Sequence, residues 1–252
     1  MRFVIALLLG LVLVPAARAA DGPAPFTPAQ RAEIVGILRD ALVHDPSILR
    51  DAVAALQASD SANREAEARS AIAAAEPALS HAPGDPVAGN PKGDVTVVEF
   101  YDLRCPYCRR MLPVIDALLK RDPNVRLVYK DIPILGPGSV IGARAVLAAQ
   151  RQGPDAYARL QAVLMHGSAQ ITEDSVQAAA RATGLDWARL QRDMKDPAIA
   201  ARLKDNLDLA HQLGVDGTPA FVIGQQLVAG AVELAELQGA VAAARGATVT
   251  AR

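Results

Sequence analysis

The two cysteines of this chain, Cys105 and Cys108, lie in one Cys-Pro-Tyr-Cys motif. Two thiols at this spacing can form a disulfide with each other and exchange it with thiols of another molecule. The motif stands between a strand-like run and a stretch of helical spacing, so Cys105 falls at a helix N-terminus, where unpaired N–H groups stabilise a thiolate. We therefore expect Cys105, the more exposed thiol, to be the nucleophile, and Cys108 to resolve the mixed disulfide.

Three other roles of the motif compete with thiol–disulfide exchange. A structural disulfide between Cys105 and Cys108 would close too small a ring to constrain the unfolded chain much. A zinc site would need two further nitrogen or sulfur ligands, and the sequence holds no second C-x-x-C and no H-x-x-H. A Cu(I) site formed by the two thiolates remains an alternative. Apart from that alternative, we expect no metal and no cofactor.

Two further segments fit the same chemistry. Glu99 stands on the strand-like run before Cys105, and because burying an acid is costly we interpret it as a proton shuttle for Cys108. The alternative is a residue at the strand end that faces water. Thr218-Pro219 precedes another strand-like run, where a cis bond would let the Thr218 backbone pair with an extended substrate. Most such sequences are trans turns, so this motif is weak alone.

The elements around these residues predict an α/β domain. We expect strands at 95–100, 125–129, 220–223 and 226–228, and helices at 105–120, 234–244 and through most of 139–211. The order is β-α-β, a helical block, then β-β-α, which indicates one sheet with a helical insertion at about 139–211. Before the domain, 20–80 is predicted to form a helical leader, and the proline- and glycine-rich residues 81–94 a linker.

The N-terminal residues have the pattern of a secretory signal peptide. Met1-Arg2 gives a positive start, an apolar run follows over 3–14, and Ala17-Arg18-Ala19 supplies small residues for cleavage after Ala19. The run of about 12 apolar residues is too short to cross about 30 Å of hydrocarbon as a membrane anchor. We therefore expect 1–19 to be removed and the mature chain to be a soluble exported protein, periplasmic or in another compartment where disulfides persist.

The leader should form amphipathic helices that need a partner surface. Thr27-Pro28-Ala29-Gln30 is a capping box with proline in the first turn, and Asp45-Pro46 stops one helix and starts the next. Apolar residues follow at helical spacing between 34 and 56, and short helices of this kind cannot bury such a stripe alone. The leader is therefore a candidate for homo-oligomer formation.

Three segments taken together resemble the DsbA-like branch of the thioredoxin superfamily. Residues 97–108, 129–136 and 214–221 are similar to its active-site, second-strand and cis-proline segments, in order, and the match covers roughly 85–245. The stretch 34–56 resembles the leader of ScsC-type suppressor-of-copper-sensitivity proteins. The resemblance implies a thioredoxin-like fold over 95–247 and these roles: nucleophile Cys105, resolving thiol Cys108, buried acid Glu99 and cis-proline Pro219, with Pro106, Tyr107 and Thr218 contacting the substrate.

These observations predict an exported thiol–disulfide oxidoreductase. The resemblance implies that the leader makes some members oligomeric isomerases; a monomeric dithiol oxidase and a Cu(I)-binding protein are the alternatives. The expected partners are client proteins and a membrane thiol reductase or oxidase. The formal net charge of -1 argues against a nucleic acid. Archetypal DsbA oxidases have histidine where Tyr107 stands, and without that cation beside Cys105 we expect a less oxidising disulfide.

Overall fold

The computed structural model describes residues 26–167 and 170–250, with side chains as far as 247. The signal peptide expected at 1–19 lies outside the described residues. The chain divides into two compact units, the first ending at Asp60 and the second starting at Ser61. This boundary falls within a single helix, α2 (Ser47–Ser80). None of the helices within the described ranges has both the length and the apolar composition needed to span a bilayer.

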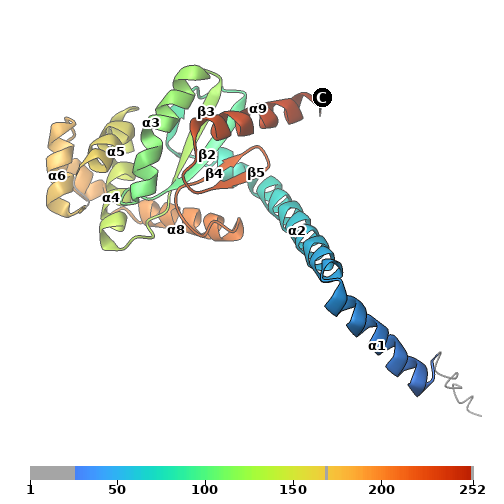
Figure 1. The fold of residues 1–252 in the computed structure, drawn as a ribbon. Helices are drawn as coiled ribbons and strands as arrows, with labels where there is room; N and C mark the ends of the chain where they lie inside the picture. The colour runs from blue at the N-terminus through green and yellow to red at the C-terminus, as the bar shows by residue number, and fades with distance from the viewer. Residues whose placement is uncertain (1–25, 168–169, 251–252) are drawn as a thin grey trace, which may run out of the picture. The chain divides into compact units, whose positions relative to one another are not determined.

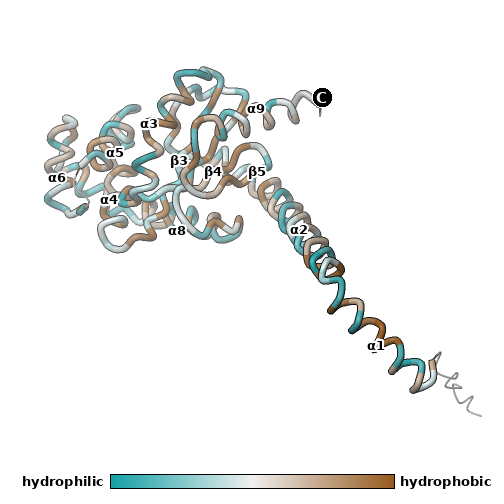
Figure 2. Tube along the Cα trace, in the orientation of Figure 1, coloured by the Kyte–Doolittle hydropathy of each residue, from teal (hydrophilic) through white to brown (hydrophobic). Residues whose placement is uncertain are grey.

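The first unit consists of α1 (Pro28–His44) and the start of α2. The capping box predicted at the start of α1 is confirmed, because the side chains of Thr27 and Gln30 each bond to the other's backbone N–H. No residue of α1 is buried, and the apolar residues of both helices can be followed in Figure 2. Those with exposed side chains are Ile34, Val35, Ile37, Leu38, Leu42, Val43, Ile48, Leu49, Val53 and Leu56.

The second unit contains a five-stranded mixed sheet in the order β1-β3-β2-β4-β5. The central strands β2 and β3 are parallel, and the other neighbouring pairs are antiparallel. Both central strands are buried almost throughout, as their apolar runs predict. The strands are β1 (Val87–Gly89), β2 (Val95–Tyr101), β3 (Val125–Asp131), β4 (Ala220–Ile223) and β5 (Gln226–Ala229).

Helices cover both faces of this sheet (Figure 1). One face packs against α3 (Pro106–Arg121) and α9 (Leu234–Thr250). The other packs against α8 (Pro197–Gln212) and the last turns of α2, where Ile72 and Leu79 join the core. The chain between β3 and β4 also forms α4 (Pro137–Ala149), a short 3-10 turn (Gln150–Gln152), α5 (Ala156–His166), α6 (Glu173–Ala182) and α7 (Trp187–Asp193).

The predicted α/β organisation with a helical insertion is confirmed. The predicted strands and helices are present, with ends that differ by a few residues. Two features were not predicted. Strand β1 lies within 81–94, the segment expected to be a linker, and pairs with β3. In addition, α2 continues as one helix to Ser80, so the expected leader 20–80 shares 61–80 with the second unit.

Buried ion pairs hold the segment between α2 and β1 against the sheet. Asp85 accepts hydrogen bonds from Lys130 Nζ at 2.5 Å and from Arg202 Nη1 at 2.9 Å. The Lys130 ammonium also donates to the carbonyl oxygen of Ala78 at 2.6 Å. The side chains of Lys130 and Asp85 are almost completely buried, and breaking a buried pair leaves an uncompensated charge. Pairing of charges thus helps to fix this segment on β3 and α8.

Candidate active site

The two cysteines lie where β2 gives way to α3. Cys105 is the N-cap residue of α3. Pro106 occupies the first turn, where its missing N–H removes no helical hydrogen bond. Both cysteines are free thiols in this structure. Cys105 is 4% exposed and Cys108 is 1% exposed, so Cys105 is the more accessible thiol by a small margin.

The surroundings of the two thiols drive their pKa values apart. A hydrogen bond from the Cys108 thiol is the main cause that lowers the pKa of Cys105 to about 5, and backbone N–H groups of the first helical turn act in the same direction. Burial, the hydrogen bond to Cys105 and the charge of Glu99 raise the pKa of Cys108. At neutral pH Cys105 is therefore the thiolate and Cys108 the thiol, the division of roles that disulfide exchange requires.

A cis peptide bond lies beside the cysteines. The Thr218–Pro219 bond is cis, the conformation that the resemblance implied. It stands just before β4, whose antiparallel pairing with β2 brings it to the same end of the sheet. The Sγ of Cys105 is 3.2 Å from the carbonyl oxygen of Thr218, a residue 113 positions away in the sequence. The fold therefore places the Thr218 backbone where a polypeptide bound at Cys105 would meet it.

Glu99 is buried on β2 beneath the cysteines. Its residue exposure is 2%, which excludes a position facing water. Its neighbours across the sheet are Tyr129 of β3 and Phe221 of β4. Burial raises the pKa of Glu99 well above its ordinary value, and the negative charges of Asp131 and Cys105 raise it further. Glu99 thus favours its protonated form, and it is close enough to influence Cys108 electrostatically.

Asp102 is a residue of this site that the sequence analysis did not single out. Its carboxylate is buried and accepts four hydrogen bonds. The donors are the backbone N–H groups of Arg104 (2.7 Å), Ile134 (2.9 Å) and Leu135 (3.0 Å) and the hydroxyl of Ser139 (2.8 Å). They tie the loop before Cys105 to the loop between β3 and α4. The available sequence signal was an acidic residue directly after a buried strand.

Exposed side chains surround the two thiols. Pro106 and Tyr107 are both exposed, and the guanidinium carbon of Arg110 lies 4.4 Å from the centroid of the Tyr107 ring, a cation–π contact. Ile134 and Leu135, on the loop that Asp102 holds, are also exposed. A polypeptide that reaches Cys105 would meet a mixed apolar and basic surface.

A second buried carboxylate, Asp131, ends β3. Its Oδ1 accepts a hydrogen bond from the Tyr101 hydroxyl at 2.8 Å and its Oδ2 one from the Tyr157 hydroxyl at 3.1 Å. The two hydroxyls are 2.6 Å apart. Burial raises the pKa of Asp131 to about 7, although both hydroxyls act to lower it. The sequence offered a Tyr-Lys-Asp run at a strand end, without a sign of which side chain points at the site.

Three chemically different groups thus meet at this end of the sheet: an ionised thiol, a protonated thiol and a buried acid. Among the described residues, no cluster of three or more His, Cys, Asp or Glu is arranged to hold a metal ion. Cys105 and Cys108 form the pair that Cu(I) could use, since thiolates are soft ligands. The arrangement can carry out thiol–disulfide exchange without an added group.

Two family models match the chain. Residues 96–242 match the DSBA-like thioredoxin domain, which includes the cysteines, Glu99 and the cis-proline. Residues 30–62 match the copper resistance protein ScsC N-terminal domain. Along the chain the ScsC match comes first and the DSBA-like match second, in agreement with the two resemblances found in the sequence.

Solved structures resemble the chain over most of their length. A thioredoxin-like oxidoreductase from Silicibacter pomeroyi DSS-3 is 49% identical, with a TM-score of 0.65, and the match covers 68% of this chain and 97% of that one. Proteus mirabilis ScsC in a transitional conformation is 30% identical, with a TM-score of 0.65, over 88% of this chain and 98% of that one.

A curated relative is much longer than this chain. The Na(+)/H(+) antiporter NhaA 1 of Salinispora arenicola (strain CNS-205) is 30% identical over 166 residues, which is 65% of this chain and 25% of the antiporter. The chain thus spans about a quarter of the length of this relative, and the similarity concerns that part alone.

Proposed function

The chain belongs to the family of DSBA-like thioredoxin domains, a family of thiol–disulfide oxidoreductases, and on this premise we propose that it exchanges disulfides with client proteins through Cys105 and Cys108. The observation that carries the proposal is the state of Cys105. The Cys105 sulfur sits at the N-cap of α3. Its thiol donates a hydrogen bond of 3.2 Å to the carbonyl oxygen of Thr218, and the donors around it lower its pKa to about 5.

The first step is attack of the Cys105 thiolate on a client disulfide. A bond forms between Cys105 and one client sulfur, and the other client sulfur leaves as a thiolate with the electron pair. The Thr218 backbone pairs with the extended client segment, while Pro106 and Tyr107 contact it from the helix side. Pro219 shapes this surface through its cis bond. The product is a mixed disulfide, and the proposed roles of these residues follow from their positions around Cys105.

Two outcomes of the mixed disulfide define the activity. When a client thiolate attacks the client sulfur bound to Cys105, the client gains a rearranged disulfide and Cys105 is released as a thiolate. When Cys108 attacks the sulfur of Cys105, the client leaves reduced and the enzyme holds a Cys105–Cys108 disulfide. In that second case Glu99 takes the proton of Cys108. A membrane thiol reductase would then return the enzyme to its dithiol form.

We assign the protein to isomerisation or reduction because of its N-terminal helices. Apolar side chains on α1 and at the start of α2 are exposed in the single chain, and such residues are normally covered. A homo-oligomer through these helices would cover them and bring several sites to one client. The signal-peptide pattern at 1–19 supports a location outside the cytoplasm, where client disulfides form.

Trapping of mixed disulfides tests the proposed exchange. In Cys108→Ser the resolving thiol is absent, so client proteins should remain bound to Cys105 and should be released by a reductant. Cys105→Ser is the matched control and should trap none. The absence of trapped clients in Cys108→Ser would refute the proposal. Alkylation of thiols in freshly quenched cells then gives the direction: mostly reduced cysteines mean isomerase or reductase, and mostly oxidised cysteines mean a dithiol oxidase.

Copper binding is a second candidate function, favoured by the match to the copper resistance protein ScsC N-terminal domain at residues 30–62. The thiolates of Cys105 and Cys108 would hold Cu(I) between them. If copper binding is the function, we expect tight Cu(I) binding by the reduced protein, no trapped clients in Cys108→Ser, and little ability to refold proteins with scrambled disulfides.

A further inference from the structure

Four polar side chains lie on one face of the sheet, below the cysteines. In the parallel register of β2 and β3, Glu99 is opposite Tyr129 and Tyr101 is opposite Asp131. Residues two apart on a strand point to the same face. Glu99 and Asp131 therefore occupy diagonal positions on one buried face, with Tyr157 reaching the same place from α5. Both carboxyl groups are at least 98% buried, since their exposures are 2% and 1%.

Within residues 26–167 and 170–247, the main interactions that shift the pKa values of Glu99 and Asp131 involve no cation. Lys130, which precedes Asp131 on β3, points to the opposite face of the sheet and is bound to Asp85. Burial has the largest effect on the pKa of Asp131 and raises it; the hydroxyls of Tyr101 and Tyr157 and its own backbone lower it, and the negative charge of Asp102 raises it. The charges that act on Glu99 are those of Asp131 and Cys105, both negative. Asp116 on α3 adds a further negative charge near Tyr129.

Two buried carboxyl groups without a cation cannot both ionise cheaply, so one of them keeps a proton. The hydrogen bonds decide which one. Burial raises the pKa of both groups, but only Asp131 lies within hydrogen-bonding distance of the hydroxyls of Tyr101 and Tyr157, which lower its pKa because such donors stabilise a carboxylate. Burial and both neighbouring charges instead favour the protonated form of Glu99. When one of the two groups is ionised, the negative charge therefore resides on Asp131 and the proton on Glu99.

We propose that Asp131, held as a carboxylate by Tyr101 and Tyr157, is a positioning residue that keeps a proton on Glu99 and thereby slows the attack of Cys108 on a mixed disulfide. This inference rests on the proposed function of the cysteines. In this proposal, the buried cluster of Glu99, Tyr101, Asp131 and Tyr157 sets how fast Cys108 resolves the mixed disulfide.

The chemistry of resolution explains the effect. When Cys108 attacks Cys105, the Cys105–Cys108 bond forms, the bond from Cys105 to the client breaks, and the client sulfur leaves as a thiolate. The proton of Cys108 needs a base, and Glu99 can accept it only when it is ionised. With the charge on Asp131, ionised Glu99 is scarce and Cys108 stays a thiol. A client thiolate then has longer to attack the mixed disulfide, which favours isomerisation over release.

The test uses the reduced full chain and dithiobis(nitrobenzoate), an aromatic disulfide. Attack by Cys105 releases one coloured thiolate, and attack by Cys108 on the resulting mixed disulfide releases a second. In Asp131→Asn the second release should be faster at neutral pH, by about tenfold for each unit by which the pKa of Glu99 falls, less a smaller loss because Glu99 becomes a weaker base. The midpoint of its pH profile should move to lower pH.

Three variants make this test specific. Tyr157→Phe removes one donor to Asp131 and should shift the profile in the same direction by less. Asp155→Asn is the matched control, since it removes the same charge at an exposed position two residues from Tyr157 and should leave the midpoint unchanged. In a Glu99→Gln background, Asp131→Asn should no longer accelerate the second release, because the base through which it acts is gone.

An unmoved midpoint in both Asp131→Asn and Tyr157→Phe would overturn the inference, as would an equal acceleration in the Glu99→Gln background. A purely structural role of Asp131 would lower the thermal midpoint of unfolding without moving the pH profile. Failure of the proposed function has a different signature. The Cys108→Ser variant would then trap no clients, whatever the pH profile of the second release.

Discussion

At the scale of the residue, Cys105 is set apart by what surrounds its sulfur. The thiol of Cys108 and the N–H groups of the first helical turn lower the pKa of Cys105 to about 5. The thiolate is therefore stabilised by uncharged donors. Because hydrogen bonds from fixed backbone groups are screened by salt less than surface charges are, its reactivity should depend little on ionic strength.

The pKa of Cys105 predicts how the stability of the reduced protein changes with pH. Folding lowers the pKa of Cys105 from 9.0 to about 5. Between these two pH values the unfolded chain therefore binds more protons than the folded one, and the free energy of unfolding rises with pH. The contribution is complete above pH 9 and is lost as pH falls through 5. Urea unfolding of the reduced protein should show this gain relative to Cys105→Ser. Parallel stabilities of the two proteins from pH 5 to 9 would contradict it.

Sequence reasoning reached some residues of the site and missed others for a physical reason. Cys105 and Cys108 were found because their spacing is a chemical motif, and Glu99 because an acid inside an apolar run is rare. Asp102 and Asp131 stand at strand ends, where an acid normally faces water. Their burial depends on donors from loops and helices distant in the sequence, such as Tyr157, and local patterns carry no sign of them.

At the scale of the element, Asp102 joins two loops that carry the exposed surface of the site. Its four hydrogen bonds hold the segment before α3 against the segment that leads into α4. Two of the donors are consecutive backbone N–H groups, those of Ile134 and Leu135, which share the oxygen Oδ2. The attachment of Ile134 and Leu135 to the loop before Cys105 thus depends on one side chain.

Substituting Asp102 should therefore affect both stability and exchange. In Asp102→Asn an amide N–H replaces one acceptor oxygen, and losing buried hydrogen bonds of this kind costs about 1–3 kcal/mol of unfolding free energy. Thermal unfolding and the rate of client disulfide reduction should both fall. Asp174→Asn, at an exposed position in the first turn of α6, is the control. Unchanged stability in Asp102→Asn would show that its hydrogen bonds are dispensable.

The elements that the sequence predicted are those with strong local signals. The apolar run of β2 and the helical spacing of α3 can be recognised from the local sequence alone. Strand β1 has three residues, too few for a recognisable alternation, and exists because β3 offers it a free edge. The end of α2 lies in an alanine-rich stretch, and only the packing of Ile72 and Leu79 on the sheet distinguishes it from a solvated helix.

At the scale of the whole molecule, the apolar residues of the first unit are the feature that a single chain leaves unexplained. Leu38 is 57% exposed and Ile37 is 62% exposed. Burying side chains of this size is worth about 1.5–3 kcal/mol each. Several of them along α1 give a large driving force for association, which suits the proposed oligomer.

Charged substitutions on α1 test this association in the full chain. Leu38→Glu places a charge among the apolar residues and should shift the molar mass measured by light scattering from an oligomer to a monomer. Arg39→Glu, at the adjacent exposed position, is the control and should leave the mass unchanged. A native chain that is already monomeric at micromolar concentration would refute the oligomer. Point variants suit this test better than deletion of 20–80, because Ile72 and Leu79 belong to the core.

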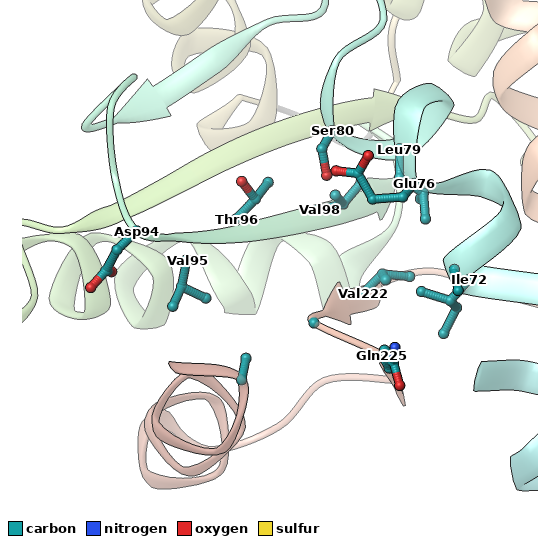
Figure 3. Close-up of a pocket in the computed structure, with 13 residues that line it drawn as sticks. Ile72, Glu76, Leu79, Ser80, Asp94, Val95, Thr96, Val98, Val222 and Gln225 are labelled. Atoms are coloured by element: carbon teal, nitrogen blue, oxygen red, sulfur yellow. The ribbon is translucent and has the colours of Figure 1, made fainter. Parts of the chain in front are cut away.

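A cavity lies between the end of α2 and the sheet, and residues of both elements line it. It has a volume of about 410 Å³, and Ile72, Glu76 and Leu79 from the helix face Val98 and Val222 from the strands across it (Figure 3). With Asp85 bound to Lys130, the stretch 61–86 completes the second unit.

For the exchange of modules between genes, this means that the natural cut lies inside α2 rather than after it. A recombination joint near residue 60 would carry the complete second unit to a new partner, whereas one near 90 would remove the part of the sheet's cover that α2 supplies and leave Lys130 without Asp85.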